Sequence, residues 1–203
     1  MASLVDIANF ALGEVAEQTI NTLEDSVKPA REAKRYIKQS IREVLAAGKW
    51  KCAREAAVLS QDATAPAFGW QYAYELPADF IRMVRFNDVD PDAVLNDLFE
   101  IRGTRIETDE SICKIVYIED LVFGDGDVGI MPPLMVKAVY LNLAAKLAWV
   151  MQQNRTLKEG LEEAAERALR RAKATDAQDE FMPLVDSSST SQWIKGRIAS
   201  TNG

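Results

Sequence analysis

The chain has 203 residues, of which 48% are hydrophobic and 27% charged, a composition typical of a folded globular protein and not of a disordered chain. Its net charge of -7 and pI near 4.8 argue against a protein that binds nucleic acid through the phosphates, because phosphate binding requires concentrated Lys and Arg. The sequence contains no histidine, which removes the commonest general base, the usual catalytic triads and most zinc sites.

Two helices are predicted in the first quarter of the chain. Residues 3–12 form a short apolar helix with Asp6 in its first turn, and Gly13 is expected to close it. Pro29 suits the first position of a longer helix over 29–47, which Gly48 ends. Its apolar stripe predicts an amphipathic surface helix and consists of Ala33, Ile37, Ile41, Val44 and Leu45.

The residues from about 50 to 120 are predicted to form a small antiparallel sheet, because apolar and polar residues roughly alternate there. Gly103 suggests a tight hairpin turn. The candidate strands are 51–59, 70–75, 80–86, 99–102, 104–107 and 112–118.

Aromatic residues are dense in this part of the chain, and they are interpreted mainly as the core of the sheet. A platform for stacked bases is the alternative. Only four basic residues are interleaved with the aromatics, too few for a nucleic-acid surface: Arg82, Arg85, Arg102 and Arg105. The aromatics are Trp50, Phe68, Trp70, Tyr72, Tyr74, Phe80, Phe86, Phe99 and Tyr117.

No motif predicts a catalytic residue, a cofactor or a metal site. The glycine-rich loop 123–130 carries Asp125 and Asp127, but a calcium loop that starts at Asp125 would place Val136 where a bidentate Glu is required. The loop is therefore predicted to be a turn. Cys52 and Cys113 lack metal-type spacing and are expected to be reduced thiols in an intracellular setting, and no secretion signal is apparent.

The helix predicted over 133–153 is apolar on nearly all sides. Its only strongly polar residues before Met151 are Lys137, Asn142 and Lys146, which do not share one face. The lysines argue against a membrane span. We expect one side of this helix to pack on the protein's own core and another on a neighbouring copy, with subunit contacts from Leu134, Val139, Leu143, Leu147, Trp149 and Val150.

A return helix is predicted over 157–178, because Thr156 and Glu159 have the spacing of a capping box. Glu residues fill its first half and Arg and Lys its second, which suits the helix dipole and allows i,i+4 ion pairs. This mixed charge indicates a solvated face in preference to a charge-based binding surface. The inner stripe is Leu157, Leu161, Ala164, Ala165, Ala168, Leu169 and Ala172.

The end of the chain, 186–203, is predicted to be a polar tether that leads to Trp193. One interpretation is a frayed terminus, or Trp193 tucked back on its own domain. The other is an arm that docks into a partner protein, because Trp and Arg are favoured interface anchors. The docking residues would be Trp193, Ile194, Arg197 and Ile198.

In order and spacing, several short segments resemble the head-to-tail adaptor of short-tailed bacteriophages, of the tail tubular protein A type. The resemblance covers about 7–197 and departs from the family pattern in the loop 87–97 and beyond Arg197. The segments are FALGE at 10–14, INTL at 20–23, AGKW at 47–50, YELPADF at 74–80, and Met131-Pro132 before an alanine-rich helix.

The resemblance implies a structural virion protein that forms a ring of twelve copies below the portal. In such adaptors the helices pack around a channel for double-stranded DNA, which passes without specific binding. The sheet region reaches toward the tail nozzle, which is tail tubular protein B-like, while the C-terminal segment reaches along the portal. Tail fibres are a further partner that the resemblance implies. The protein would act at the head-tail junction of the virion after assembly in the host cytoplasm, with no enzymatic step and no membrane.

The predicted fold class is α+β, mainly α: a helical bundle with a long C-terminal helical hairpin, an inserted small antiparallel sheet and an extended C-terminal arm. Residues 1–185 would be the adaptor domain and 186–203 the docking arm. Two other functions stay open at this point: a virion-associated lytic or DNA-processing enzyme, and a cytosolic helical module that binds a partner.

Overall fold

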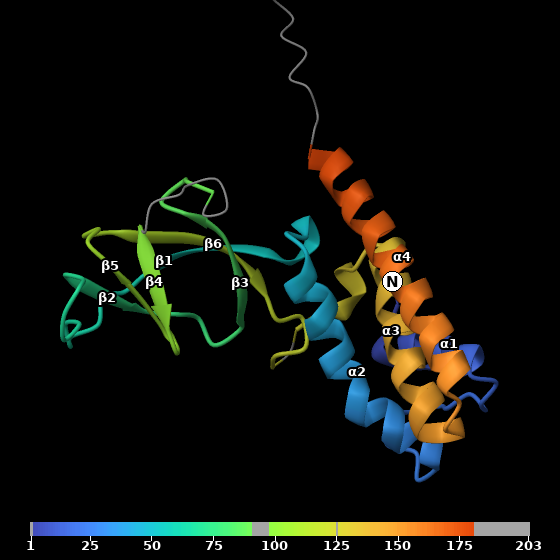
Figure 1. The fold of residues 1–203 in the computed structure, drawn as a ribbon. Helices are drawn as coiled ribbons and strands as arrows, with labels where there is room; N and C mark the ends of the chain where they lie inside the picture. The colour runs from blue at the N-terminus through green and yellow to red at the C-terminus, as the bar shows by residue number, and fades with distance from the viewer. Residues whose placement is uncertain (1, 91–97, 125, 181–203) are drawn as a thin grey trace, which may run out of the picture.

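A computed structural model describes residues 2–90, 98–124 and 126–180 (Figure 1). The fold is α+β with mainly helix, as predicted: helices from both ends of the sequence form a bundle, and the strands between them form a separate β module. The helices are α1 Leu4–Glu14, α2 Lys28–Ala47, α3 Pro133–Gln152 and α4 Arg155–Glu180. The strands are β1 Arg54–Leu59, β2 Tyr72–Glu75, β3 Phe80–Phe86, β4 Phe99–Arg102, β5 Arg105–Thr108 and β6 Cys113–Glu119.

Helix α1 is closed by a different residue from the one predicted. A capping box starts it, because the Ser3 hydroxyl accepts from the Asp6 amide and the Asp6 carboxylate accepts from the Ser3 amide. Gly13 stays inside the helix, and the left-handed turn falls on Ala16, with φ 53°. The amide of Glu17 then donates to the carbonyl of Leu12, which completes a Schellman motif.

Helix α2 ends at Gly48 as predicted, but for a different reason from the usual one. Gly48 has an extended backbone and makes no left-handed turn. A β-carbon at Gly48 would lie only 2.7 Å from the Trp50 ring, so glycine is required for close packing. The predicted stripe of α2 is buried, from Ala33 to Leu45.

Helix α4 begins at Arg155, two residues earlier than predicted, because of how the turn after α3 is built. Gln153 is left-handed, with φ 53°, and the Asn154 side chain accepts from the amide of Leu157 at 3.0 Å. Asn154 therefore caps α4, and the capping box predicted at Thr156 is wrong because Thr156 already lies inside the helix. The expected i,i+4 ion pairs are present on its exposed face.

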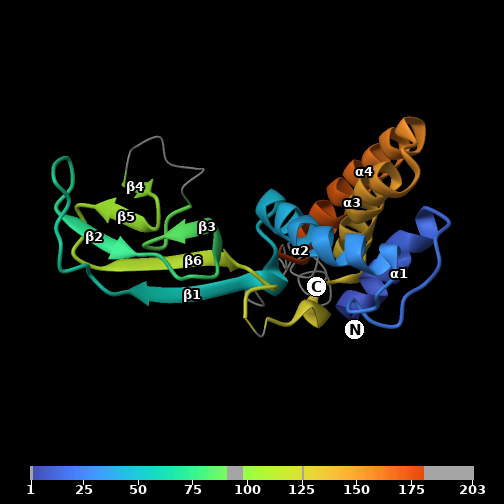
Figure 2. The same ribbon diagram turned by 90° about the horizontal axis from the view of Figure 1, so that it is seen from below.

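Helix α3 is the centre of the bundle, and α1, α2 and α4 all pack against it (Figures 1 and 2). By length and composition α3 could also cross a membrane. Its burial among three helices of the same chain accounts for its apolar surface, as in the core helix of a globular domain.

The β module contains two antiparallel sheets where one was predicted, with strand orders β1-β6-β3 and β2-β5-β4. The bounds of β3 and β4 agree with the prediction, whereas β1 starts only at Arg54 because Lys51–Ala53 forms a short 3₁₀ helix. Gly103, with φ 61°, makes the expected two-residue turn between β4 and β5. The two sheets enclose a second core of Tyr74, Phe86, Ile106, Ile115 and Tyr117, among others.

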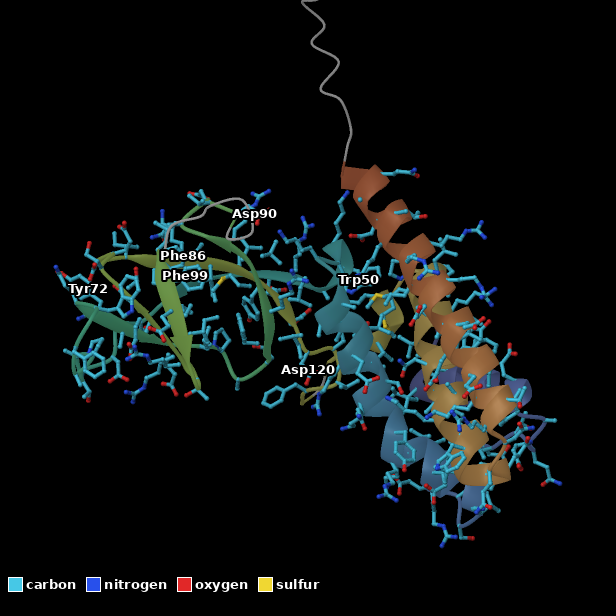
Figure 3. All side chains as sticks on the ribbon, viewed as in Figure 1. Trp50, Tyr72, Phe86, Asp90, Phe99 and Asp120 are labelled. Carbon is cyan, nitrogen blue, oxygen red and sulfur yellow. The ribbon has the colours of Figure 1, made fainter. Side chains whose placement is uncertain are left out.

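The ends of β1 and β6 connect the β module to the bundle, and Figure 3 labels Trp50 and Asp120 at this junction. Trp50 is buried in the core of the helices, not in the sheet core as predicted, and its indole N–H donates to the carbonyl of Val44 at 2.7 Å. The buried carboxylate of Asp120 accepts from the Arg42 guanidinium at 2.8 Å and from the amide of Val122. These contacts join α2 to the chain that leaves β6.

Replacing Asp120 by Asn is expected to lower the free energy of unfolding by about 1–2 kcal/mol, because the Arg42 guanidinium then faces a neutral acceptor and the ion pair is lost. The Asp120 side chain is 6% exposed, but that of Arg42 is 46% exposed, so water screens the ion pair. This screening favours a loss near the lower end of the range. Urea denaturation followed by circular dichroism measures the change. As a control, Glu24→Gln removes the exposed Lys34–Glu24 pair and should cost about 0.5 kcal/mol or less. Equal losses of unfolding free energy in the two variants would show that the buried carboxylate of Asp120 contributes no more to stability than an exposed ion pair does.

Candidate interaction surfaces

Three of the six residues predicted to contact a neighbouring copy lie inside the protein's own bundle. Val139, Leu143 and Leu147 are each 0% exposed in α3. Because α1, α2 and α4 of the same chain cover them, they cannot contact another copy, and the prediction is wrong for these three residues.

The other three predicted contacts keep accessible surface. Trp149 is 51% exposed, and Leu134 and Val150 are half-buried. Leu134 and Trp149 lie near opposite ends of α3, about 22 Å apart along the helix axis. They therefore belong to separate surfaces, and their role as subunit contacts stays a prediction.

A groove of about 330 Å³ runs along α3 between α2 and α4. Its floor includes Ala138 and Asn142, and the side-chain oxygen of Asn142 is buried without a hydrogen-bond donor among the described residues. At one wall the Lys146 ammonium donates to Glu43 at 2.7 Å and to the buried Ser40 hydroxyl at 3.2 Å. Along this groove α3 is not fully covered by its own chain.

The loop before β2 and strand β4 carry a group of contacting side chains, which we call the β-tip patch: Phe68, Trp70, Glu100 and Arg102. Phe68 is 74% exposed, and the Arg102 guanidinium lies 5.5 Å from the centre of its ring. Arg102 also pairs with Glu100 at 2.8 Å, and this hydrogen bond lowers the pKa of Glu100. Exposed aromatic and Arg side chains together are typical of protein interfaces.

The interpretation of the aromatics as sheet core is correct for Tyr74, Phe86 and Tyr117, which are buried in the β module. It is wrong for Phe68. Phe68 stands directly before Gly69, which has φ 91°, and outside every segment of alternating apolar and polar residues. These two features are the signal that would have placed Phe68 in an exposed loop.

Three carboxylates gather around Tyr117 on the β module. Glu55 lies opposite Tyr117 in the β1–β6 register, and the Tyr117 hydroxyl donates to Asp79 at 3.1 Å. Burial raises the pKa of Tyr117 to about 12, with Asp79 adding to the shift. Burial also raises the pKa of Glu119, and repulsion from Glu55 and Asp79 adds to it.

Replacing Glu119 by Gln is expected to stabilise the protein at pH 7 by a few tenths of a kcal/mol, a small value because Glu119 is partly exposed to water. The pKa of Glu119 is higher in the folded protein than its ordinary 4.5, so the folded state binds this proton more tightly. The contribution of Glu119 to stability therefore falls as the pH rises from below 4.5 through its raised folded pKa, and the Gln variant lacks this contribution. Thermal unfolding from pH 3.5 to 8 tests this. As a control, Glu75→Gln removes a charge elsewhere on the module. A stability difference between Glu119→Gln and wild type that grows toward low pH would contradict the expected direction of the effect.

No chemical site emerges among the residues that the structure describes. No group of three or more carboxylate and thiol side chains there could hold a metal ion. In the loop 123–130, Asp127 accepts from the amide of Gly129 at 2.7 Å and caps the short helix Val128–Ile130, while Asp125 lies outside the described residues. Cys52 and Cys113 are free thiols, and burial raises the pKa of each to about 11, which makes them poor nucleophiles at neutral pH.

The four predicted docking residues of the C-terminal arm, Trp193, Ile194, Arg197 and Ile198, lie outside the described residues. No protein-family model matches the chain, and no curated protein matches it.

Proposed function

We propose that this protein is a structural head-to-tail adaptor of a short-tailed bacteriophage, which forms a ring between the portal and the tail nozzle. The observation that carries the proposal is the division of the chain into two parts with separate cores, each with its own exposed apolar side chains. Such an arrangement suits a protein that binds a different partner at each end. The order of short sequence segments that resembles the adaptor family supports the same function.

The bundle offers surfaces for contacts between copies. Trp149 on α3 and the groove that contains Asn142 are two such surfaces. Each would contact a different surface of the neighbouring copy. Contacts between two different surfaces of identical subunits close into a ring when the rotation between neighbours allows it. The family resemblance, and not the shape of one subunit, is the basis for proposing twelve copies.

The β-tip patch suits the proposed contact with the tail nozzle, because two of its residues belong to β4, and β4 lies in the β module, away from the helices (Figure 1). The C-terminal arm is proposed to bind the portal. A subunit with net charge -7 is compatible with a channel through which DNA slides without being held, because like charges repel.

Electron microscopy of the pure protein mixed with portal protein tests the ring. We expect rings with wild type, and we expect Trp149→Asp to abolish them, because burying an unpaired carboxylate at a subunit contact is strongly unfavourable. As a matched control, Phe68→Asp places the same charge on the β-tip patch and should leave the rings intact while preventing attachment of the nozzle. A protein that stays monomeric with portal in sedimentation would overturn the proposal.

A further inference from the structure

A second pocket, of about 300 Å³, lies where the ends of three segments meet. Pro132, Pro133, Leu134 and Met135 line it from the start of α3, and Trp50 from the loop after α2. The last part of α4 provides the remaining wall, with Ala172, Thr175 and Asp176. The lining is largely apolar, and the Asp176 carboxylate accepts from the amide of Lys51 at 3.2 Å, which ties the end of α4 to this position.

The pocket exists because α4 is longer than its partner in the hairpin. Helix α3 begins at Pro133, whereas α4 continues to Glu180, so its last turns have no part of α3 beside them. In Figure 1 this end of α4 projects beyond the bundle. The wall formed by Thr175 and Asp176 is only one helical turn from Glu180, where the described part of the chain ends.

The chain continues from that point with five apolar residues, Phe181-Met182-Pro183-Leu184-Val185. Pro183 disfavours the helical conformation of the residue before it, so the amino-acid sequence does not favour continuation of α4 through this segment. We propose that residues 181–185 turn back and bind in the pocket between Trp50, Leu134 and Thr175 of the same chain.

The distances allow this contact. From Asp176 to Glu180 the helix rises about 6 Å, and five extended residues span up to about 17 Å. Because the segment is attached beside the pocket, its effective concentration there is on the order of millimolar, far above that of the same segment on another copy in dilute solution. A largely apolar pocket also matches five apolar residues, whereas the polar residues that begin at Asp186 have no comparable reason to enter it.

This inference does not depend on the adaptor proposal. It would give the arm 186–203 a defined starting point on the bundle, and it would cover Leu134 with its own chain, which leaves Trp149 and Val150 as the predicted subunit contacts on α3.

Thiol labelling of the full-length protein tests the inference. Thr175→Cys places a reporter in the pocket, and Ala174→Cys places one on the neighbouring exposed position outside it. Each reporter is combined with the wild-type segment, with Phe181→Asp plus Leu184→Asp, or with Ile194→Asp plus Ile198→Asp, which makes the same two changes in the arm. Maleimide labelling is quantified per site by mass spectrometry, and the raised pKa of Cys52 and of Cys113 keeps the native thiols slow.

We expect the reporter at 175 to label slowly with the wild-type segment and about tenfold faster or more with the Phe181 and Leu184 changes, because the pocket is then open. The arm changes should leave its rate unaltered, and the reporter at 174 should label alike in all three backgrounds. Equal rates at 175 in all backgrounds would overturn the inference, as would acceleration by the arm changes alone. A wild-type rate that falls with rising protein concentration would also overturn it, because the segment would then come from another copy.

Discussion

Replacing Trp50 by alanine is expected to lower the free energy of unfolding by about 3–5 kcal/mol, the largest loss that we predict for a single substitution. The Trp50 side chain is 1% exposed and packs against Gly48 at the end of α2. Alanine would leave a cavity there and would deprive the carbonyl of Val44 of its indole donor. In a chain of this length the loss corresponds to a fall in melting temperature on the order of 10 °C.

Circular dichroism during thermal and urea unfolding measures this effect without relying on tryptophan fluorescence. Trp50→Phe loses the hydrogen bond but keeps most of the buried volume, so it should cost clearly less than alanine. Trp70→Ala is the matched control, because Trp70 is partly exposed on the β-tip patch and should cost about 1 kcal/mol or less. A Trp50→Ala variant as stable as Trp70→Ala would show that the junction between bundle and module is not organised around Trp50.

Deletion of residues 186–203 is expected to abolish attachment to the portal while it leaves the folded part intact. All the residues that form the two described cores lie before residue 181, so the deletion keeps every one of them. The expected loss is large because the arm carries Trp193 and Arg197, which are the residue types that dominate binding energy at interfaces. Co-sedimentation with portal and assembly of particles in infected cells provide the two measurements.

A less severe variant separates the docking residues from the length of the arm. Trp193→Ala should weaken portal binding by tenfold or more, corresponding to about 1.4 kcal/mol or more, whereas Ser189→Ala in the tether should have little effect. Normal particle assembly after the deletion would contradict the docking role of the arm. If the deleted protein instead lost binding only to a protein that is not a virion component, the alternative of a cytosolic partner-binding module would replace the adaptor.

Local patterns predicted most individual elements, because the signals that begin and end them lie within a few residues. The predicted bounds of β3 and β4 are the observed ones, and α2 and α3 begin and end within one residue of the predictions. The errors at Gly13 and Thr156 have a common cause. A neighbouring residue, Ala16 or Asn154, could satisfy the same helix terminus, and the choice between two adequate caps depends on where the following chain must go.

The interaction surfaces were predicted less well. The β-tip patch joins residues from a loop and from β4 that lie about 30 positions apart in the sequence, as the contact of Trp70 with Glu100 shows. No local pattern indicates that they meet. The division of the strands into two sheets has the same origin, because β1 pairs with β6 and β2 with β5, both across long stretches of chain.

The sequence by itself determined that α3 must be surrounded, because its apolar residues leave no side for water. Only the tertiary structure decided what surrounds it. Helices α1 and α2, more than 85 residues earlier in the chain, return to cover Val139, Leu143 and Leu147 together with α4, so the chain itself supplies most of the neighbours that the sequence demands. Hydrophobic burial is non-directional. An apolar stripe therefore indicates how much surface must be removed from water, but not which segment of the chain, or which copy, will cover it.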